Sequence, residues 1–234
     1  MSKYEPLLKK LNLSFNNQEI LENAFIHRSY LNEHKKFHLP SNEKLEFLGD
    51  SVLSLVTTIF LYRNYPLLDE GNYTDIKASI VRTESLAEVG KKIELGDYLY
   101  LSKGEQLQSG KDNKNILADC FEALIGAIFL DQGFEVTYKF IADHLFKDKL
   151  NYIVDNKLYL SPKSRLQEYV QANFKVLPNY KTIKETGPEH QKFFSVATFI
   201  KTRQISEGSG NSKKAAEEEA AQNALKKLDM YGKI

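Results

Sequence analysis

The stretch Asn42-Glu-Lys-Leu-Glu-Phe-Leu-Gly-Asp-Ser-Val-Leu53 decides how the front of this chain folds. At helical pitch its acids Glu43, Glu46 and Asp50 fall at i, i+3 and i+7 and share one narrow face, opposite an apolar stripe. Like charges at this spacing repel, and Lys44 points about 100° away from Glu43 because adjacent helical residues do not share a face. The pattern predicts a helix whose acidic face receives positive charge from outside the helix.

Two further residues distinguish this helix from an ordinary solvated acidic face, which is the alternative interpretation. Gly49 costs a helix roughly 1 kcal/mol relative to alanine and is usually kept where another backbone or a ligand comes close. Phe47 lies beside the acids, whereas a solvated face is more often rimmed by polar residues. We therefore expect a helix, capped by Ser41 or Asn42 and extending to Tyr62, that is buried on most sides in an all-α core.

A second tract, residues 116–130, is apolar or small at every position except Asp119 and Glu122. No Lys or Arg occurs between Lys114 and Lys139, so local sequence offers these acids no partner. An unpaired ionised carboxylate in an apolar helix is costly, so it is neutralised, paired at long range or bound to a metal ion. Two acidic helices in one chain favour the metal over long-range pairing. Carboxylate donors without a thiolate or histidine set indicate Mg2+ first and Mn2+ second.

The 234-residue chain divides into an acidic front and a basic back, although its formal net charge is only +1. Residues 1–156 carry 18 Lys and Arg against 23 Asp and Glu, a balance of −5. Residues 157–234 carry 14 against 8, a balance of +6. This asymmetry predicts two domains, of which the second binds a polyanion.

Composition also indicates where the protein works. The lone cysteine, Cys120, excludes an internal disulfide framework, fits a reducing compartment and is expected to be a buried small apolar residue. The N-terminus lacks the apolar core of a signal peptide, and no segment is expected to reach the roughly 18 apolar residues of a membrane span. We expect a soluble, cytoplasmic protein with no membrane partner.

The expected elements fall into an all-α front and a mixed back. In the front, His27-Arg-Ser-Tyr30 is expected to end a helix, Glu70 to lie in a loop between two packed helices, and residues 103–115 to form a mobile loop. Front helices are expected at 4–12, 17–26, 42–62, 74–93, 116–130 and 135–154; the back is expected to have helix 162–173, strands 179–185, 193–200 and 203–207, and helix 213–228. The back therefore has the order αβββα, with alanines in its last helix that permit close packing on a sheet.

Several motifs, taken in order, resemble the bacterial ribonuclease III family along essentially the whole chain. They are Asn42-Glu-Lys-Leu-Glu-Phe-Leu-Gly-Asp-Ser51, Ile116-Leu-Ala-Asp-Cys-Phe-Glu-Ala-Leu-Ile-Gly126, Leu166-Gln-Glu-Tyr169, Gly187-Pro-Glu-His190 and Ser212-Lys-Lys-Ala-Ala-Glu217. The first two are similar to that family's acidic motifs and the last three to a double-stranded-RNA-binding domain. Lys44 stands where arginine is usual, which keeps the charge but loses a bidentate fork.

The resemblance implies an all-α ribonuclease III-type endonuclease domain over 1–156, a linker over 157–161 and an α+β double-stranded-RNA-binding domain over 162–230. It implies a Mg2+-dependent endoribonuclease that hydrolyses double-stranded RNA and processes rRNA precursors and other structured transcripts. It further implies a homodimer in which each subunit cuts one strand, with no organic cofactor. Carboxylate-bound Mg2+ would activate water for phosphodiester hydrolysis, and the basic tail would hold the duplex across its minor grooves.

The resemblance also assigns roles to individual residues. Asp50 and Glu122 are implied to be catalytic, and Phe47 to plug into the partner subunit. The metal ligands are implied to be Glu46, Asp50, Asp119 and Glu122, with Glu43 and Glu70 as accessory acids; Gln167, His190, Ser212, Lys213 and Lys214 are implied to bind RNA.

Two alternatives belong to other classes of protein. One is a non-catalytic double-stranded-RNA-binding protein whose acidic domain only dimerises or serves as a scaffold, against which the six matching acids argue. The other is an all-α carboxylate di-iron protein. That class uses Glu-x-x-His pairs, and none of the acids at 43, 46, 119 and 122 has a histidine three residues later.

Overall fold

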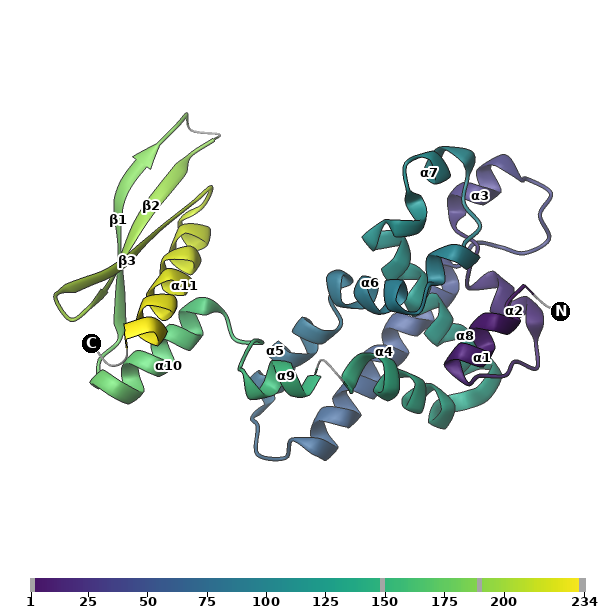
Figure 1. Cartoon of the computed structure of the whole chain (residues 1–234), viewed down its shortest axis with the longest axis horizontal. Coiled ribbons are helices and arrows are strands. Elements are labelled where there is room, and N and C mark those ends of the chain that lie inside the picture. Colours follow the sequence, from purple (N-terminus) through teal and green to yellow (C-terminus); the bar gives the residue numbers. More distant parts are fainter. Residues whose placement is uncertain (1–2, 148–149, 189–190, 232–234) are drawn as a thin grey trace. The chain divides into compact units, whose positions relative to one another are not determined.

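The computed structural model describes residues 3–147, 150–188 and 191–231, and the side chains of these up to Leu228. The chain folds into two compact units, residues 1–156 and 157–234. The first unit is helical, and the second has the order αβββα (Figure 1). The expected fold class is thereby confirmed.

The first unit consists of helices of very different lengths. They are α1 Glu5–Leu11, α2 Gln18–Asn23, α3 Arg28–Glu33, α4 Glu43–Asn64, α5 Glu70–Ile80, α6 Thr83–Lys92, α7 Lys103–Leu107, α8 Lys114–Ile141 and α9 Leu150–Asp155, with the 3₁₀ helices η1 Leu95–Tyr98 and η2 Gly110–Asp112 and the π-helical turn η3 Ala142–Phe146. The long helices α4 and α8 pack on each other and form the centre of this unit.

Glycines allow α4 and α8 to cross at very short range. A Cβ added to Gly49 of α4 would lie 1.8 Å from the carbonyl oxygen of Glu122. A Cβ added to Gly126 of α8 would lie 2.3 Å from the carbonyl oxygen of Leu45. Only glycine fits at either position, so the prediction that another backbone approaches Gly49 is confirmed.

The segment His27–Tyr30 starts a helix and does not end one. Helix α2 already ends at Asn23, and the Ser29 N–H donates to His27 Nδ1 at 3.3 Å, which caps α3. No residue of α3 is fully buried, so the helix has no apolar period that sequence reasoning could detect.

Glu70 is the first residue of α5 and does not lie in a loop. The Asn72 N–H donates to Asp69 Oδ1 at 2.8 Å, and this cap starts the helix. The expected helix 74–93 is divided into α5 and α6 by extended backbone at Arg82 (φ −67°, ψ 151°). The expectations of a loop at Glu70 and of one continuous helix are therefore wrong.

The expected loop at residues 103–115 also differs. Residues 103–115 contain α7 and η2, and the Glu105 N–H donates to Ser102 Oγ at 3.3 Å to cap α7. The expected break between helices 116–130 and 135–154 is present, because Gly133 (φ 77°, ψ −174°) interrupts α8 with a kink. The second helix ends earlier than expected, at Ile141, and is followed by η3 and by the separate helix α9.

Helix α4 is less buried than its composition suggests. Val52 lies in the core, but the exposed fractions of Phe47, Leu55 and Tyr62 are 79%, 53% and 74%.

Among the described residues, α4 is the one helix long and apolar enough to cross a membrane, so the expectation that no segment reaches that length is wrong. The apolar side chains of α4 that face α8 are part of the core of the first unit.

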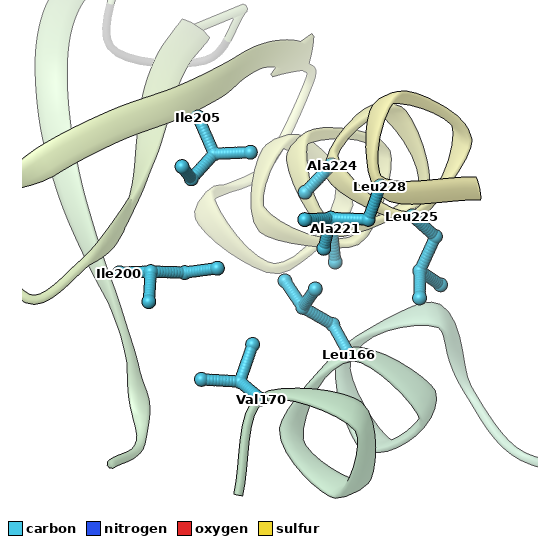
Figure 2. Packing of buried hydrophobic residues seen from close by; sticks show 8 residues of the cluster. All are labelled: Leu166, Val170, Ile200, Ile205, Ala221, Ala224, Leu225 and Leu228. Carbon is cyan, nitrogen blue, oxygen red and sulfur yellow. The ribbon is translucent and has the colours of Figure 1, made fainter. Parts of the chain in front are cut away.

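The second unit packs two helices against a three-stranded antiparallel sheet with the order β1-β2-β3. Its elements are α10 Pro162–Phe174, β1 Pro178–Thr186, β2 Phe193–Ile200, β3 Arg203–Gly210 and α11 Lys213–Tyr231. Figure 2 shows the core, in which Leu166 and Val170 of α10 face Ile200, Ile205 and the buried side chains of α11. A Cβ on Gly208 would lie 2.1 Å from the backbone nitrogen of Ala220, so the alanines of α11 do pack closely on the sheet.

Side chains of α11 cover the outer edge of β3. Asn223 Nδ2 donates to the Glu207 carbonyl at 2.8 Å, Lys227 Nζ donates to the Ile205 carbonyl at 3.0 Å, and the Ser209 N–H donates to the Glu219 carboxylate. Backbone groups of an edge strand that would otherwise lack a partner are thereby hydrogen-bonded.

Candidate active site

Three acids predicted from two distant motifs meet beside the α4–α8 crossing. Glu46 comes from α4, and Asp119 and Glu122 come from α8. Their carboxylate oxygens lie within 4.8 Å of one another, and all three residues are partly buried. The close crossing at Gly49 and Gly126, each one helical turn beyond an acid, is what brings the two acidic faces together.

Burial and mutual repulsion disfavour the charged forms of these acids. Burial, together with the charges of Asp50, Glu46 and Asp119, raises the pKa of Glu122 to about 8. Burial likewise raises the pKa of Glu46 and of Asp119, with neighbouring acids adding to the rise at Glu46. Such a group takes up protons or a cation. Its donors are all carboxylate oxygens, which fits a hard divalent cation.

The other predicted acids lie outside this close group of three. Asp50 is exposed on α4, one turn beyond Glu46, and acts on Glu122 through its charge. Glu43 is exposed at the start of α4, where it accepts a hydrogen bond from Ser41 Oγ at 2.7 Å. Glu70 is exposed at the start of α5.

Arg28 of α3 supplies positive charge to the acids, which agrees with the expectation that this charge comes from outside the acidic helix. Arg28 Nη1 lies 3.8 Å from Glu43 Oε1. Its charge opposes the rise in pKa that burial causes at Glu46 and at Asp119. Sequence reasoning missed Arg28 because it placed this residue at the end of a helix. The available signal was the absence of Lys and Arg from residues 45–62, which required a cation from another element.

Phe47 lies on the same helix as Glu46 but points into solvent. Its exposed fraction of 79% is high for an aromatic residue, and Leu55 and Tyr62 extend an exposed apolar strip along α4. A strip of this kind is typical of a surface that contacts another protein.

In the second unit, the described residues that are predicted to bind RNA are exposed on α10 and at the start of α11. Gln167 is exposed on α10. Lys213 and Lys214 are exposed at the start of α11, where the Ala215 N–H donates to Ser212 Oγ at 3.1 Å. His190 lies outside the described residues.

Two family models match the chain. The model described as Ribonuclease-III-like matches residues 17–149, and the model described as Double-stranded RNA binding motif matches residues 162–228. The chain belongs to the ribonuclease III family. The resemblance found in the sequence is confirmed, and with it the class of enzyme.

Ribonuclease III relatives align over nearly the whole chain. The protein named Ribonuclease 3 from Chloroflexus aurantiacus is 43% identical over 228 residues, which cover 97% of this chain and 92% of the relative. The Ribonuclease 3 of Leptospira interrogans is 44% identical over 224 residues, which cover 96% and 90%. Glu46, Asp119 and Glu122 lie within the part of the chain that matches the ribonuclease III model. This family generally uses a divalent metal.

A solved structure supports the fold of the nuclease unit. The nuclease domain of ribonuclease III from Campylobacter jejuni matches with 33% sequence identity and a TM-score of 0.58, covering 63% of this chain and 99% of that domain. That structure is described as showing flexibility in a region involved in dimer formation.

Proposed function

We propose that this ribonuclease III hydrolyses phosphodiester bonds of double-stranded RNA with Mg2+, or with Mn2+ in its place. Its substrates are rRNA precursors and other structured transcripts, and it works in the cytoplasm. The observation that carries this proposal is the group of three carboxylates within 4.8 Å, in a chain that also contains a double-stranded-RNA-binding motif. The free, buried thiol of Cys120 is consistent with a reducing compartment.

The family resemblance and the close group of three acids support the proposed roles of the acids. Glu46, Asp119 and Glu122 would hold the cation and Asp50 would complete the ligand set, with Asp50 and Glu122 as the proposed catalytic residues. Bound Mg2+ supplies an activated water and stabilises charge on the attacking and leaving oxygens. Glu43 and Glu70 are exposed accessory acids that add negative charge around this group.

The second unit holds the duplex in this proposal. We place the nuclease domain at 1–156, a linker at 157–161 and the RNA-binding domain at 162–230. A-form RNA hides its base edges in a deep, narrow major groove, so recognition uses 2′-hydroxyls across the minor grooves and the phosphates between them. Gln167 and His190 are assigned to the minor groove, and Ser212, Lys213 and Lys214 to the phosphates.

The chain is proposed to act as a homodimer. Cutting both strands in one encounter takes two acidic groups, and the chain has one copy of each acidic motif. A two-fold pair uses one surface twice, and the exposed Phe47 beside the acids is the proposed anchor of that surface. Each subunit then cuts one strand.

Incubation with a long RNA duplex, with and without Mg2+, tests the proposed activity. We expect short double-stranded products only when Mg2+ is present. The matched variant Glu122→Gln removes a ligand but little volume, so it should lower the cleavage rate by at least about 100-fold while duplex affinity changes only a few fold. Cleavage by the variant within a few fold of the parent chain would refute the assigned site. An intact duplex with the parent chain would support the non-catalytic alternative.

A further inference from the structure

Arg28 stands on a backbone that neighbouring segments hold firmly in place. The His27 N–H donates to the Tyr100 carbonyl at 3.2 Å, and the Ser102 N–H donates to Ser29 Oγ at 3.1 Å. These bonds attach both residues that flank Arg28 to one segment of chain, 100–102. The start of α3 is thereby fixed beside the acids before any ligand binds.

The side chain of Arg28, in contrast, is only loosely engaged. Its guanidinium lies 3.8 Å from Glu43, and the side chains are 73% and 55% exposed. An ion pair with this exposure contributes little to stability, because water and salt screen it and two long side chains lose freedom to form it. Arg28 can therefore exchange Glu43 for another anion at little cost.

A backbone phosphate is the anion that suits this position. The guanidinium offers a planar fork of donors that fits phosphate bidentately. Any RNA strand that approaches Glu46 and Asp119 brings phosphates on both sides of the bond to be cut. The acids alone repel those phosphates, and Arg28 supplies positive charge to the same group.

We propose that Arg28 binds a phosphate of the RNA backbone next to the acidic group, leaving Glu43 to do so, and thereby positions the duplex over Glu46, Asp119 and Glu122. The inference rests on the proposed action on duplex RNA. It makes Arg28 a positioning residue of the nuclease unit. The competing explanation is that Arg28 only tethers α3 to α4 through Glu43.

A double-mutant cycle separates these explanations. Duplex affinity is measured over a range of salt concentrations in the full chain carrying Glu122→Gln, which we expect to bind RNA without cutting it. We expect Arg28→Gln to lower affinity about tenfold at low salt and to reduce the slope of log affinity against log salt by about one. Arg28→Lys, which retains the charge, should restore most of that slope.

The second arm repeats Arg28→Gln in a chain that already carries Glu43→Gln. A phosphate contact predicts that Arg28→Gln still weakens binding by about the same factor, because the contact does not depend on Glu43. A tether predicts that Arg28→Gln becomes silent once Glu43 has been replaced, and that result would overturn the proposal. Arg82→Gln is the matched control, since Arg82 is 58% exposed and forms a similarly loose pair with Glu84 at 4.0 Å.

The outcome is distinguishable from a failure of the proposed function. If the parent chain cuts duplex RNA with Mg2+ but Arg28→Gln binds it with unchanged affinity and salt slope, only the role of Arg28 is wrong. If the parent chain does not cut, the proposed activity is wrong, and the binding cycle still decides whether Arg28 contacts phosphate.

Discussion

Glu122 is the residue at which burial and like charge act most strongly on one carboxyl group. Its pKa of about 8 means that, without a metal ion, it is largely protonated near neutral pH. The same carboxyl in an unfolded chain has its ordinary pKa of 4.5. A metal ion bound at the proposed site would therefore displace a proton, and this would couple metal binding and stability to pH.

This shift predicts how stability depends on pH. Because the folded-state pKa lies above the unfolded one, the contribution of Glu122 to stability is complete below pH 4.5 and is lost as pH rises through about 8. In the presence of a chelator, the unfolding temperature of the parent chain should fall from pH 6 to pH 9 by several degrees more than that of Glu122→Gln. Thermal unfolding of both proteins measures the difference, and parallel curves would contradict the raised pKa.

At the scale of residues, the acids could be predicted but the cation beside them could not. Glu46, Asp119 and Glu122 stand out because local spacing and an apolar surrounding leave each without a nearby partner. Arg28 becomes informative only when α3 and α4 are placed side by side, and local sequence does not contain that distance. Asp50 lies outside the close group of three for the same reason, since the tilt of one helix on the other decides which oxygens meet.

At the scale of elements, the α4–α8 crossing predicts a severe effect of one methyl group. Gly49→Ala would place a Cβ 1.8 Å from the Glu122 carbonyl oxygen, so the helices must separate. We expect a loss of about 1–3 kcal/mol of stability from overpacking, together with a loss of cleavage because the acidic faces move apart. Gly104→Ala in α7 is the control, because its nearest neighbour is 3.9 Å away. An unchanged unfolding temperature for Gly49→Ala would show that the crossing can adjust.

Elements were predictable where apolar periodicity is long. The acidic helix, the αβββα order and the strands of the second unit follow from such patterns. The short helix α3 buries none of its residues completely, so no period marks it. The division between α5 and α6 falls in Ser79-Ile-Val-Arg-Thr83, which contains neither Gly nor Pro, so tertiary packing alone decides that break. The cap at Asp69 was a readable signal for the start of α5.

At the scale of the whole molecule, the basic tail predicts a salt-dependent activity. A chain ending at Asn156 retains the helical unit and the acids. It should still cut duplex RNA at low salt and fail near physiological salt, because phosphate contacts weaken steeply as counterions compete. Cleavage assays of both chains across a salt series measure this effect. Equal activity at every salt concentration would show that residues 157–234 do not carry duplex binding.

The proposed homodimer predicts a distinct product from mixed subunits. Heterodimers of parent and Glu122→Ala chains should nick one strand and leave the other whole, since each subunit carries one acidic group. Strand-specific labels on a duplex detect the nick. Phe47→Ala should weaken association and double-strand cutting together. A monomer that still makes double-strand breaks, seen by sedimentation at the assay concentration, would contradict the dimer.

The covered edge of β3 has a consequence for how the protein behaves when it is crowded or stored. Strands add to a sheet most readily where a row of free N–H and carbonyl groups offers a template, which is how fibres lengthen. In this chain, Asn223, Lys227 and Glu219 already occupy groups along that row. A strand of a second molecule must displace these side chains before it can pair with β3. Helix α11 therefore also disfavours fibril growth from this edge.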